Sequence, residues 1–108
     1  MTWDEVVAEA RTHPGTVLTT YYGAPAVKAN DRAVVTPSRE ADSFCLHIDL
    51  DTVEILKDTD PDTFWQTPHY EGWPGVLVRY ASDDPERIRA MIGRAVEWAK
   101  SRKPPRKR

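Results

Sequence analysis

Polar and apolar residues at the start of the chain alternate with the period of an α-helix. The apolar positions lie three or four residues apart, as on one buried helix face: Trp3, Val6, Val7 and Ala10. Thr2 and Glu5 have the spacing of a capping box, in which each side chain accepts a hydrogen bond from the other residue's amide. His13-Pro14-Gly15 ends the pattern, because proline disfavours the helical conformation in the residue before it. The sequence therefore predicts an N-terminal helix.

A longer helical pattern lies near the other end of the chain. Asp84 is a favourable N-cap residue, and Pro85 fits the first helical position, where a missing N–H is tolerated. The apolar stripe that follows has helical spacing: Ile88, Met91, Ile92, Ala95, Val96 and Ala99. Pro104-Pro105 ends this helix. Trp98 lies off the stripe, so we expect its ring to be partly exposed. A short helix is also predicted, beginning at Asp51 with a capping-box-like pattern and ending near Thr59.

Between these helices, five segments have the alternation or the β-branched content of strands: 16–22, 25–29, 32–36, 44–49 and 76–80. Asn30 and Asp31 predict a tight turn between the second and third strands, because both residues tolerate positive φ. In the fourth strand, Phe44, Leu46 and Ile48 alternate with more polar residues, which predicts a strand with one buried face.

The predicted order is α-β-β-β-β-α-β-α. Short connections favour antiparallel pairing of successive strands. We therefore expect an α+β fold, with a two-layer arrangement of an antiparallel sheet covered by amphipathic N- and C-terminal helices. The 108-residue length fits one domain, residues 1–101, followed by a basic tail, residues 102–108.

Charge is distributed unevenly between these two parts. The tail carries five basic side chains and no acidic one: Arg102, Lys103, Arg106, Lys107 and Arg108. Residues 1–101 contain 10 basic and 17 acidic side chains, a net charge of −7. A duplex-binding surface usually has the opposite sign, because its affinity depends on neutralising phosphates. Such a basic tail either makes nonspecific contacts with nucleic acid or an acidic partner, or is a solvated appendage that aids solubility.

The segment 64–75 is unusually rich in aromatic residues, proline and glycine for a connection between elements. Such a segment either forms a buried corner or shapes a recognition surface. The second alternative predicts a groove lined by aromatic and imidazole side chains: Tyr21, Trp65, His69, Tyr70 and Trp73. The first predicts that the same rings pack against the sheet, with the His69 imidazole wedged between its neighbours.

This segment resembles the MmcQ/YjbR family of small bacterial proteins. The resemblance rests on Trp65-x-Thr67-Pro68-His69-Tyr70-x-Gly72-Trp73-Pro74, the strand Gly75–Arg79 and the upstream Gly23-x-Pro25-Ala26. It covers roughly residues 3–100. The resemblance implies a compact α+β domain similar to a double-wing DNA-binding domain, and hence a non-enzymatic DNA-binding protein. Its expected nucleic-acid contacts are at the hairpin and in the tail: Lys28, Arg32, Arg102, Lys103, Arg106, Lys107 and Arg108.

The alternative function is a small-ligand or protein-interaction module that uses the aromatic groove. We predict no catalytic, cofactor-binding or metal-binding residues. Cys45 and His47 supply two potential zinc ligands, fewer than a zinc site needs. Cys45 lies among apolar residues, where burial raises a thiol pKa and disfavours a nucleophile. No catalytic arrangement of serine, histidine and aspartate can be assembled from the spacing.

The cysteine content and the lack of long apolar segments indicate the cellular location. Cys45 is the single cysteine and has no partner for an internal disulfide, which favours a reducing compartment. No apolar run is long enough to span a bilayer, and the N-terminus has no pattern of a secretory signal. We therefore expect a cytoplasmic protein with no membrane partner, a monomer by default.

Overall fold

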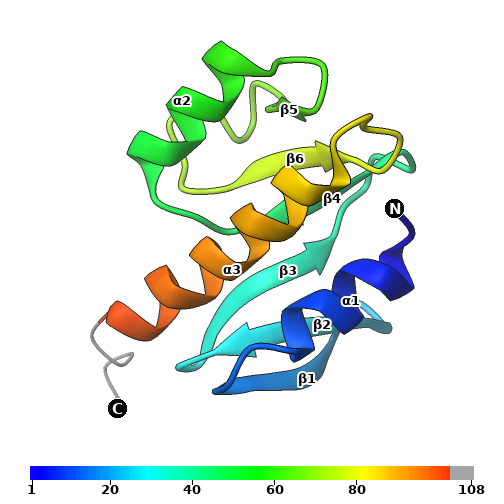
Figure 1. Ribbon diagram of the computed structural model, residues 1–108, viewed down its shortest axis with the longest axis vertical. Coiled ribbons are helices and arrows are strands. Elements are labelled where there is room, and N and C mark those ends of the chain that lie inside the picture. The colour runs from blue at the N-terminus through cyan, green and yellow to red at the C-terminus, as the bar shows by residue number, and fades with distance from the viewer. Residues whose placement is uncertain (103–108) are drawn as a thin grey trace.

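A computed structural model describes residues 1–102, which form three helices and one six-stranded antiparallel sheet (Figure 1). The elements are α1 (Trp3–Arg11), β1 (Thr16–Tyr21), β2 (Ala24–Ala29), β3 (Arg32–Pro37), β4 (Ser43–Leu46), α2 (Leu50–Thr59), β5 (Phe64–Trp65), β6 (Val76–Arg79) and α3 (Pro85–Ser101). Across the sheet the strands lie in the order β1-β2-β3-β4-β6-β5. The predicted α+β class, the antiparallel sheet and its flanking terminal helices are confirmed.

Helices α1 and α3 lie side by side over one face of the sheet (Figure 1). Their buried side chains come from the predicted stripes: Val6, Ala10, Ile88, Ile92, Ala95, Val96 and Ala99. The predicted cap of α1 is present, because Thr2 Oγ1 accepts from the Glu5 amide at 3.2 Å and Glu5 Oε1 accepts from the Thr2 amide at 2.9 Å. The hydrophobic periodicity of both helices therefore identifies the face that builds the core.

The turn between β2 and β3 is fixed to the end of α3. Asn30 and Asp31 have φ values of 53° and 58°, the left-handed conformation predicted for this turn. The Asn30 side-chain amide donates to the carbonyl oxygens of Ala99 at 3.1 Å and Arg102 at 2.7 Å. Within the described part of the chain, the Ala99 carbonyl otherwise accepts only a long 3.4 Å bond from the Arg102 amide, and Arg102 lies at the C-cap, so Asn30 serves as the side-chain cap of α3. A hairpin and a helix end that are far apart in sequence are thereby held together.

Strand β4 differs from the prediction. It ends at Leu46, and both of its faces are covered, so the predicted strand with one buried face is wrong. Phe44 is fully buried beneath the helices, while Cys45 is only 3% exposed on the opposite face. Leu77, the register partner of Cys45 in β6, is 1% exposed. Sequence alternation did not reveal this second covered face, because the covering residues lie about 25 positions later in the chain.

The start of one helix and the presence of one strand also differ from the prediction. Helix α2 begins two residues earlier than predicted, because Asp49 rather than Asp51 is its N-cap and accepts from the Thr52 amide at 3.1 Å. The two-residue strand β5 pairs with β6 and was not predicted, since two residues are too few for a periodic pattern. Among residues 1–102, no helix combines the length and apolar character needed to cross a membrane.

Candidate functional site

After strand β5, residues 66–75 of the aromatic segment fold back over the face of the sheet that α1 and α3 leave uncovered. The Tyr70 and Trp73 rings lie 5.6 Å apart, and the Trp73 ring meets His47 edge-on at 5.8 Å. Two turns shape the segment, because the Tyr70 amide donates to the Thr67 carbonyl and the Trp73 amide to the Tyr70 carbonyl, each at 2.9 Å. The segment is thus a structured corner packed on the sheet, and it also shapes the surface around it.

Gln66 holds this corner together and was missed by the sequence analysis. Its side-chain amide nitrogen donates to the carbonyl oxygens of Tyr70 at 3.0 Å, Trp73 at 3.2 Å and Gly75 at 2.6 Å. Its own carbonyl oxygen accepts from Lys57 Nζ at 2.8 Å. The only sequence signal is a long amide side chain among aromatic residues, and nothing in its spacing indicates which carbonyls it reaches.

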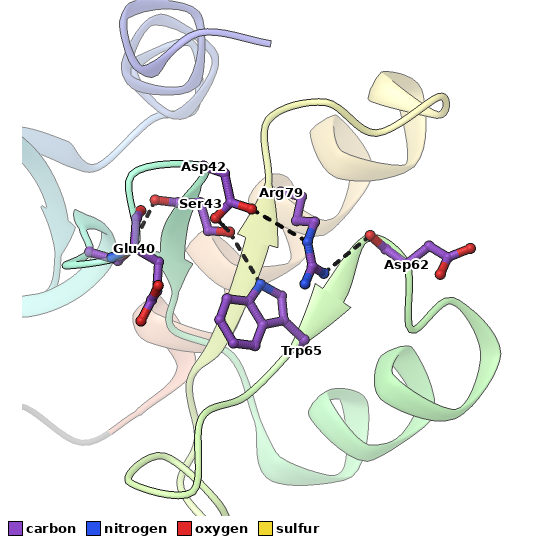
Figure 2. A network of polar contacts seen from close by, with 7 residues as sticks. Glu40, Asp42, Ser43, Asp62, Trp65 and Arg79 are labelled. Carbon is purple, nitrogen blue, oxygen red and sulfur yellow. Dashed lines mark hydrogen bonds and ion pairs between the residues drawn. The ribbon is translucent and has the colours of Figure 1, made fainter.

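Trp65 has a structural role and does not line the groove predicted for it. Figure 2 shows its indole pointing toward Ser43, where Nε1 donates to Oγ at 3.1 Å. The Arg79 guanidinium lies 4.7 Å from the Trp65 ring centroid, and Arg79 Nε lies 3.6 Å from an Asp42 carboxylate oxygen. Arg79 also donates to the Asp62 carbonyl at 3.3 Å. The polar edge of Trp65 is therefore occupied within the protein.

The other predicted groove residues divide between two pockets. Tyr21, His69 and Tyr70 meet in a groove of about 770 Å³, which we call the tyrosine groove. Its lining also includes Tyr22, Arg39, Glu40, Thr67 and Leu77. His69 is exposed and meets Tyr70 edge-on at 5.5 Å, so its imidazole is not wedged into the corner. Trp73 lies in the other pocket.

The second pocket, about 310 Å³, is formed by the β2–β3 hairpin, the corner and the end of α3. Arg32 and Arg102, two of the predicted nucleic-acid contacts, both line it, so we call it the Arg32–Arg102 pocket. Trp73, Trp98 and His47 supply its rings, and the acidic residue Asp31 also lines it. The Arg102 guanidinium lies 4.4 Å from the Trp98 ring centroid. The predicted partial exposure of Trp98 is confirmed.

Of the remaining predicted nucleic-acid contacts, the structure describes only Lys28. Lys28 does not line the Arg32–Arg102 pocket, and its Nζ lies 3.5 Å from an Asp31 carboxylate oxygen at the hairpin. Four tail residues lie outside the described residues: Lys103, Arg106, Lys107 and Arg108. Arg32 and Arg102 are therefore the two predicted contacts that the structure brings together.

Electrostatics distinguish the residues of this pocket. Burial and the nearby Arg32 charge lower the pKa of Arg102. Burial lowers the pKa of His47 to about 4, so its imidazole is neutral at pH 7 and shares a 3.0 Å hydrogen bond with Thr36 Oγ1. The pocket thus presents two guanidinium groups next to neutral rings, an arrangement suited to a phosphate and a flat base.

Cys45 lies beneath the corner and has the character of a structural residue. Burial raises the pKa of its thiol to about 11, so the nucleophilic thiolate is disfavoured at neutral pH. Within residues 1–102, no three histidine, cysteine or acidic side chains come together as a metal site.

Comparison with protein-family models, with curated proteins and with solved structures gave no match. The resemblance to the MmcQ/YjbR family therefore rests on the residues of this chain alone.

Proposed function

We propose that the protein binds single-stranded nucleic acid without altering it chemically, and that the Arg32–Arg102 pocket holds the strand. One observation carries the proposal. The hairpin and the end of α3 place two arginines at the same pocket, beside the Trp73 ring, which is 47% exposed. A phosphate between the two guanidinium groups would relieve their mutual repulsion. Arginine suits this role, because its planar donors match phosphate oxygens in pairs.

The positions of the two arginines are supported by neighbouring contacts. Asn30 lies in the turn just before Arg32, and its side-chain amide donates a hydrogen bond to the Arg102 carbonyl oxygen. Trp98 lies against the Arg102 guanidinium, a contact worth about 0.5–1 kcal/mol at an exposed site. A partly ordered pair of cations loses less conformational freedom on binding than two unrestrained side chains would.

Charge and shape favour a single strand over a duplex. Residues 1–101 carry a net charge of −7, so a wide contact with duplex phosphates would place acidic side chains near the DNA. A small pocket with an exposed indole needs only one or two phosphates and an unpaired base. Stacking of a base on an aromatic side chain contributes about 1–3 kcal/mol. At the hairpin tip, Asp31 offsets the charge of Lys28.

Two observations from the sequence agree with this proposal. The resemblance to the MmcQ/YjbR family implies DNA binding. Residues 103–108 add four basic side chains directly after Arg102 in the sequence. Such a segment strengthens association through counterion release without contributing sequence specificity. We therefore propose weak, salt-dependent binding with little preference among sequences.

The test is fluorescence anisotropy with the full-length chain and a labelled oligonucleotide of roughly 12 nucleotides, compared as single strand and as duplex. We expect the single strand to bind more tightly at low salt. The double variant Arg32→Gln/Arg102→Gln removes the two proposed phosphate contacts and should reduce affinity at least about tenfold. The slope of log K against log salt should fall in magnitude by about 0.7, because the two guanidinium groups share one phosphate and each neutralised single-strand phosphate contributes about 0.7.

Lys28→Gln is the matched control, because it removes one hairpin charge that already faces Asp31. It should leave affinity within about twofold of the unmodified chain. Deleting residues 102–108 should abolish most of the binding. Three results would overturn the proposal: no anisotropy change at low salt, tighter binding of the duplex, or an equal loss in Lys28→Gln and in the double variant.

A further inference from the structure

The tyrosine groove lies apart from the Arg32–Arg102 pocket and shares no lining residue with it. Its floor includes Leu77, which is 1% exposed. Its walls come from the β1–β2 turn, the loop after β3 and residues 67–70 of the corner. The volume of about 770 Å³ falls within the range of about 300–1,000 Å³ typical of small-molecule sites. The groove is therefore large enough for a compact organic ligand.

Two tyrosines on the β1–β2 turn are costly to expose. Tyr22 is 93% exposed and Tyr21 is 45% exposed, and their rings meet edge-on at 4.6 Å. Tyr22 also has a φ of 51°, a conformation that a bulky aromatic residue rarely adopts. The positive φ of Tyr22 belongs, with that of Gly23 at 79°, to the two-residue turn that joins β1 to β2, whereas the exposure of the two rings does not stabilise the fold. Together they place two phenol rings at the mouth of the groove, facing the corner that carries Tyr70.

One cation lies among these rings. Arg39 is exposed on the loop after β3, and within residues 1–102 its guanidinium makes no hydrogen bond or ion pair. Arg39, Tyr21 and Tyr22 all lie near enough to Tyr70 to influence the pKa of its hydroxyl, which burial raises. An acidic side chain, Glu40, also lines the groove. The negative charge of Glu40 disfavours a doubly charged anion. The groove is therefore better suited to a ligand with one negative charge, placed beside Arg39.

We propose that the tyrosine groove is a binding site for a flat aromatic molecule that carries one carboxylate. The aromatic ring packs against Tyr21, Tyr22 and Tyr70, above the apolar floor. The carboxylate accepts hydrogen bonds from the Arg39 guanidinium, whose fork of donors matches the two carboxylate oxygens. This site is independent of the nucleic-acid contacts, because its cation is Arg39 and it shares no lining residue with the Arg32–Arg102 pocket.

The probe is 2-naphthoate, titrated into the full-length chain and followed by amide chemical shifts in ¹H–¹⁵N NMR spectra. A fragment of this size is expected to bind with a Kd of about 1 mM. The shifts should be largest at residues 21–24, 38–40 and 67–70. The neutral amide 2-naphthamide tests the carboxylate, and cyclohexanecarboxylate tests the flat ring. Both should bind at least about fivefold more weakly than 2-naphthoate.

Arg39→Gln should weaken 2-naphthoate binding about tenfold, because it removes a charge-assisted hydrogen bond. Arg94→Gln is the matched control, since Arg94 is an equally exposed arginine on α3, which packs on the other face of the sheet. It should leave the Kd within about twofold. Arg32→Gln/Arg102→Gln should also retain 2-naphthoate binding, which separates this site from the proposed nucleic-acid pocket.

Several results would contradict the proposed binding site. They are an absence of shifts at ~10 mM probe, equal binding of 2-naphthamide, shifts confined to residues outside the groove, or unchanged affinity in Arg39→Gln. Tyr22→Ala provides a second test at a side chain so exposed that its removal leaves the fold intact. It should weaken 2-naphthoate several-fold while leaving the remaining spectrum in place, and an unchanged Kd would count against ring packing.

Discussion

The Asn30 side-chain amide donates to the Arg102 carbonyl oxygen at 2.7 Å, although the two residues are 72 positions apart. The same nitrogen donates to the Ala99 carbonyl at 3.1 Å. One side chain therefore caps α3 and fixes the relative position of the hairpin and the helix end. The geometry of the Arg32–Arg102 pocket depends on this contact, so stability and binding should change together when it is removed.

Asn30→Gly should destabilise the protein by about 1–2 kcal/mol, because the last carbonyls of α3 lose their side-chain donor. Glycine keeps the left-handed turn without strain, so the change isolates the cap. Urea denaturation followed by circular dichroism measures the loss. Asp31→Gly is the control at the next position of the same turn, and it should change stability by less than about 0.5 kcal/mol. Equal losses in the two variants would mean that Asn30 acts through the turn alone.

Gln66 is expected to be the most sensitive polar side chain of the corner. Its two N–H groups are shared among three backbone carbonyls. Gln66→Glu retains the size of the side chain and an acceptor for Lys57, but it directs a carboxylate at those carbonyls. We expect a loss of about 2–3 kcal/mol in unfolding free energy and faster amide exchange at residues 67–75. Glu71→Gln, an exposed change in the same segment, should have little effect on either measurement.

Local patterns were sufficient for the helices and for the hairpin turn. Caps, apolar stripes and the Asn30-Asp31 pair depend on residues close together in sequence, so they could be predicted. The covering of Cys45 could not, because it depends on where residues 64–75 fold in space. The same limit applies to the sites. Sequence alone named Arg32, Arg102, Tyr21 and Tyr70 as candidates. It could not assign them to two separate pockets or place Trp65 against Ser43.

At the contact between α3 and His13, which follows α1, one substitution is expected to have opposite effects on stability in two backgrounds. The His13 ring lies against Gly93, where an added Cβ would approach His13 Cε1 to 2.9 Å. Gly93→Ala should therefore destabilise the protein by about 1–2 kcal/mol through overpacking, although alanine is the better helix former. In a His13→Ala background the ring is absent, and Gly93→Ala should instead stabilise α3 by about 0.5–1 kcal/mol.

A double-mutant cycle measured by urea denaturation gives the coupling between these two positions. We expect about 1.5–3 kcal/mol, the difference between the two effects of the same substitution. Additive effects would show that α1 and α3 can move apart enough to accommodate a methyl group.

Stability should depend on the protonation of His47. Its native pKa is about 4 and its unperturbed pKa is 6.5, so between these values the unfolded chain binds a proton that the native state does not. Stability from the neutral imidazole is complete above pH 6.5, falls as the pH is lowered toward 4, and changes no further below it. The shift corresponds to a loss of about 3 kcal/mol. His47→Gln can retain the hydrogen bond to Thr36 but does not titrate.

Urea denaturation at a series of pH values isolates this contribution as the difference between the unmodified chain and His47→Gln. The two stability curves should run parallel above pH 6.5 and converge by up to about 3 kcal/mol as the pH approaches 4. His69→Gln replaces an exposed imidazole and serves as the control. A His47→Gln curve parallel to that of the unmodified chain through this whole range would show that Trp73 does not keep water from the His47 ring. The corner would then be open, and the pocket beside Trp73 would lack the rigid wall that base stacking requires.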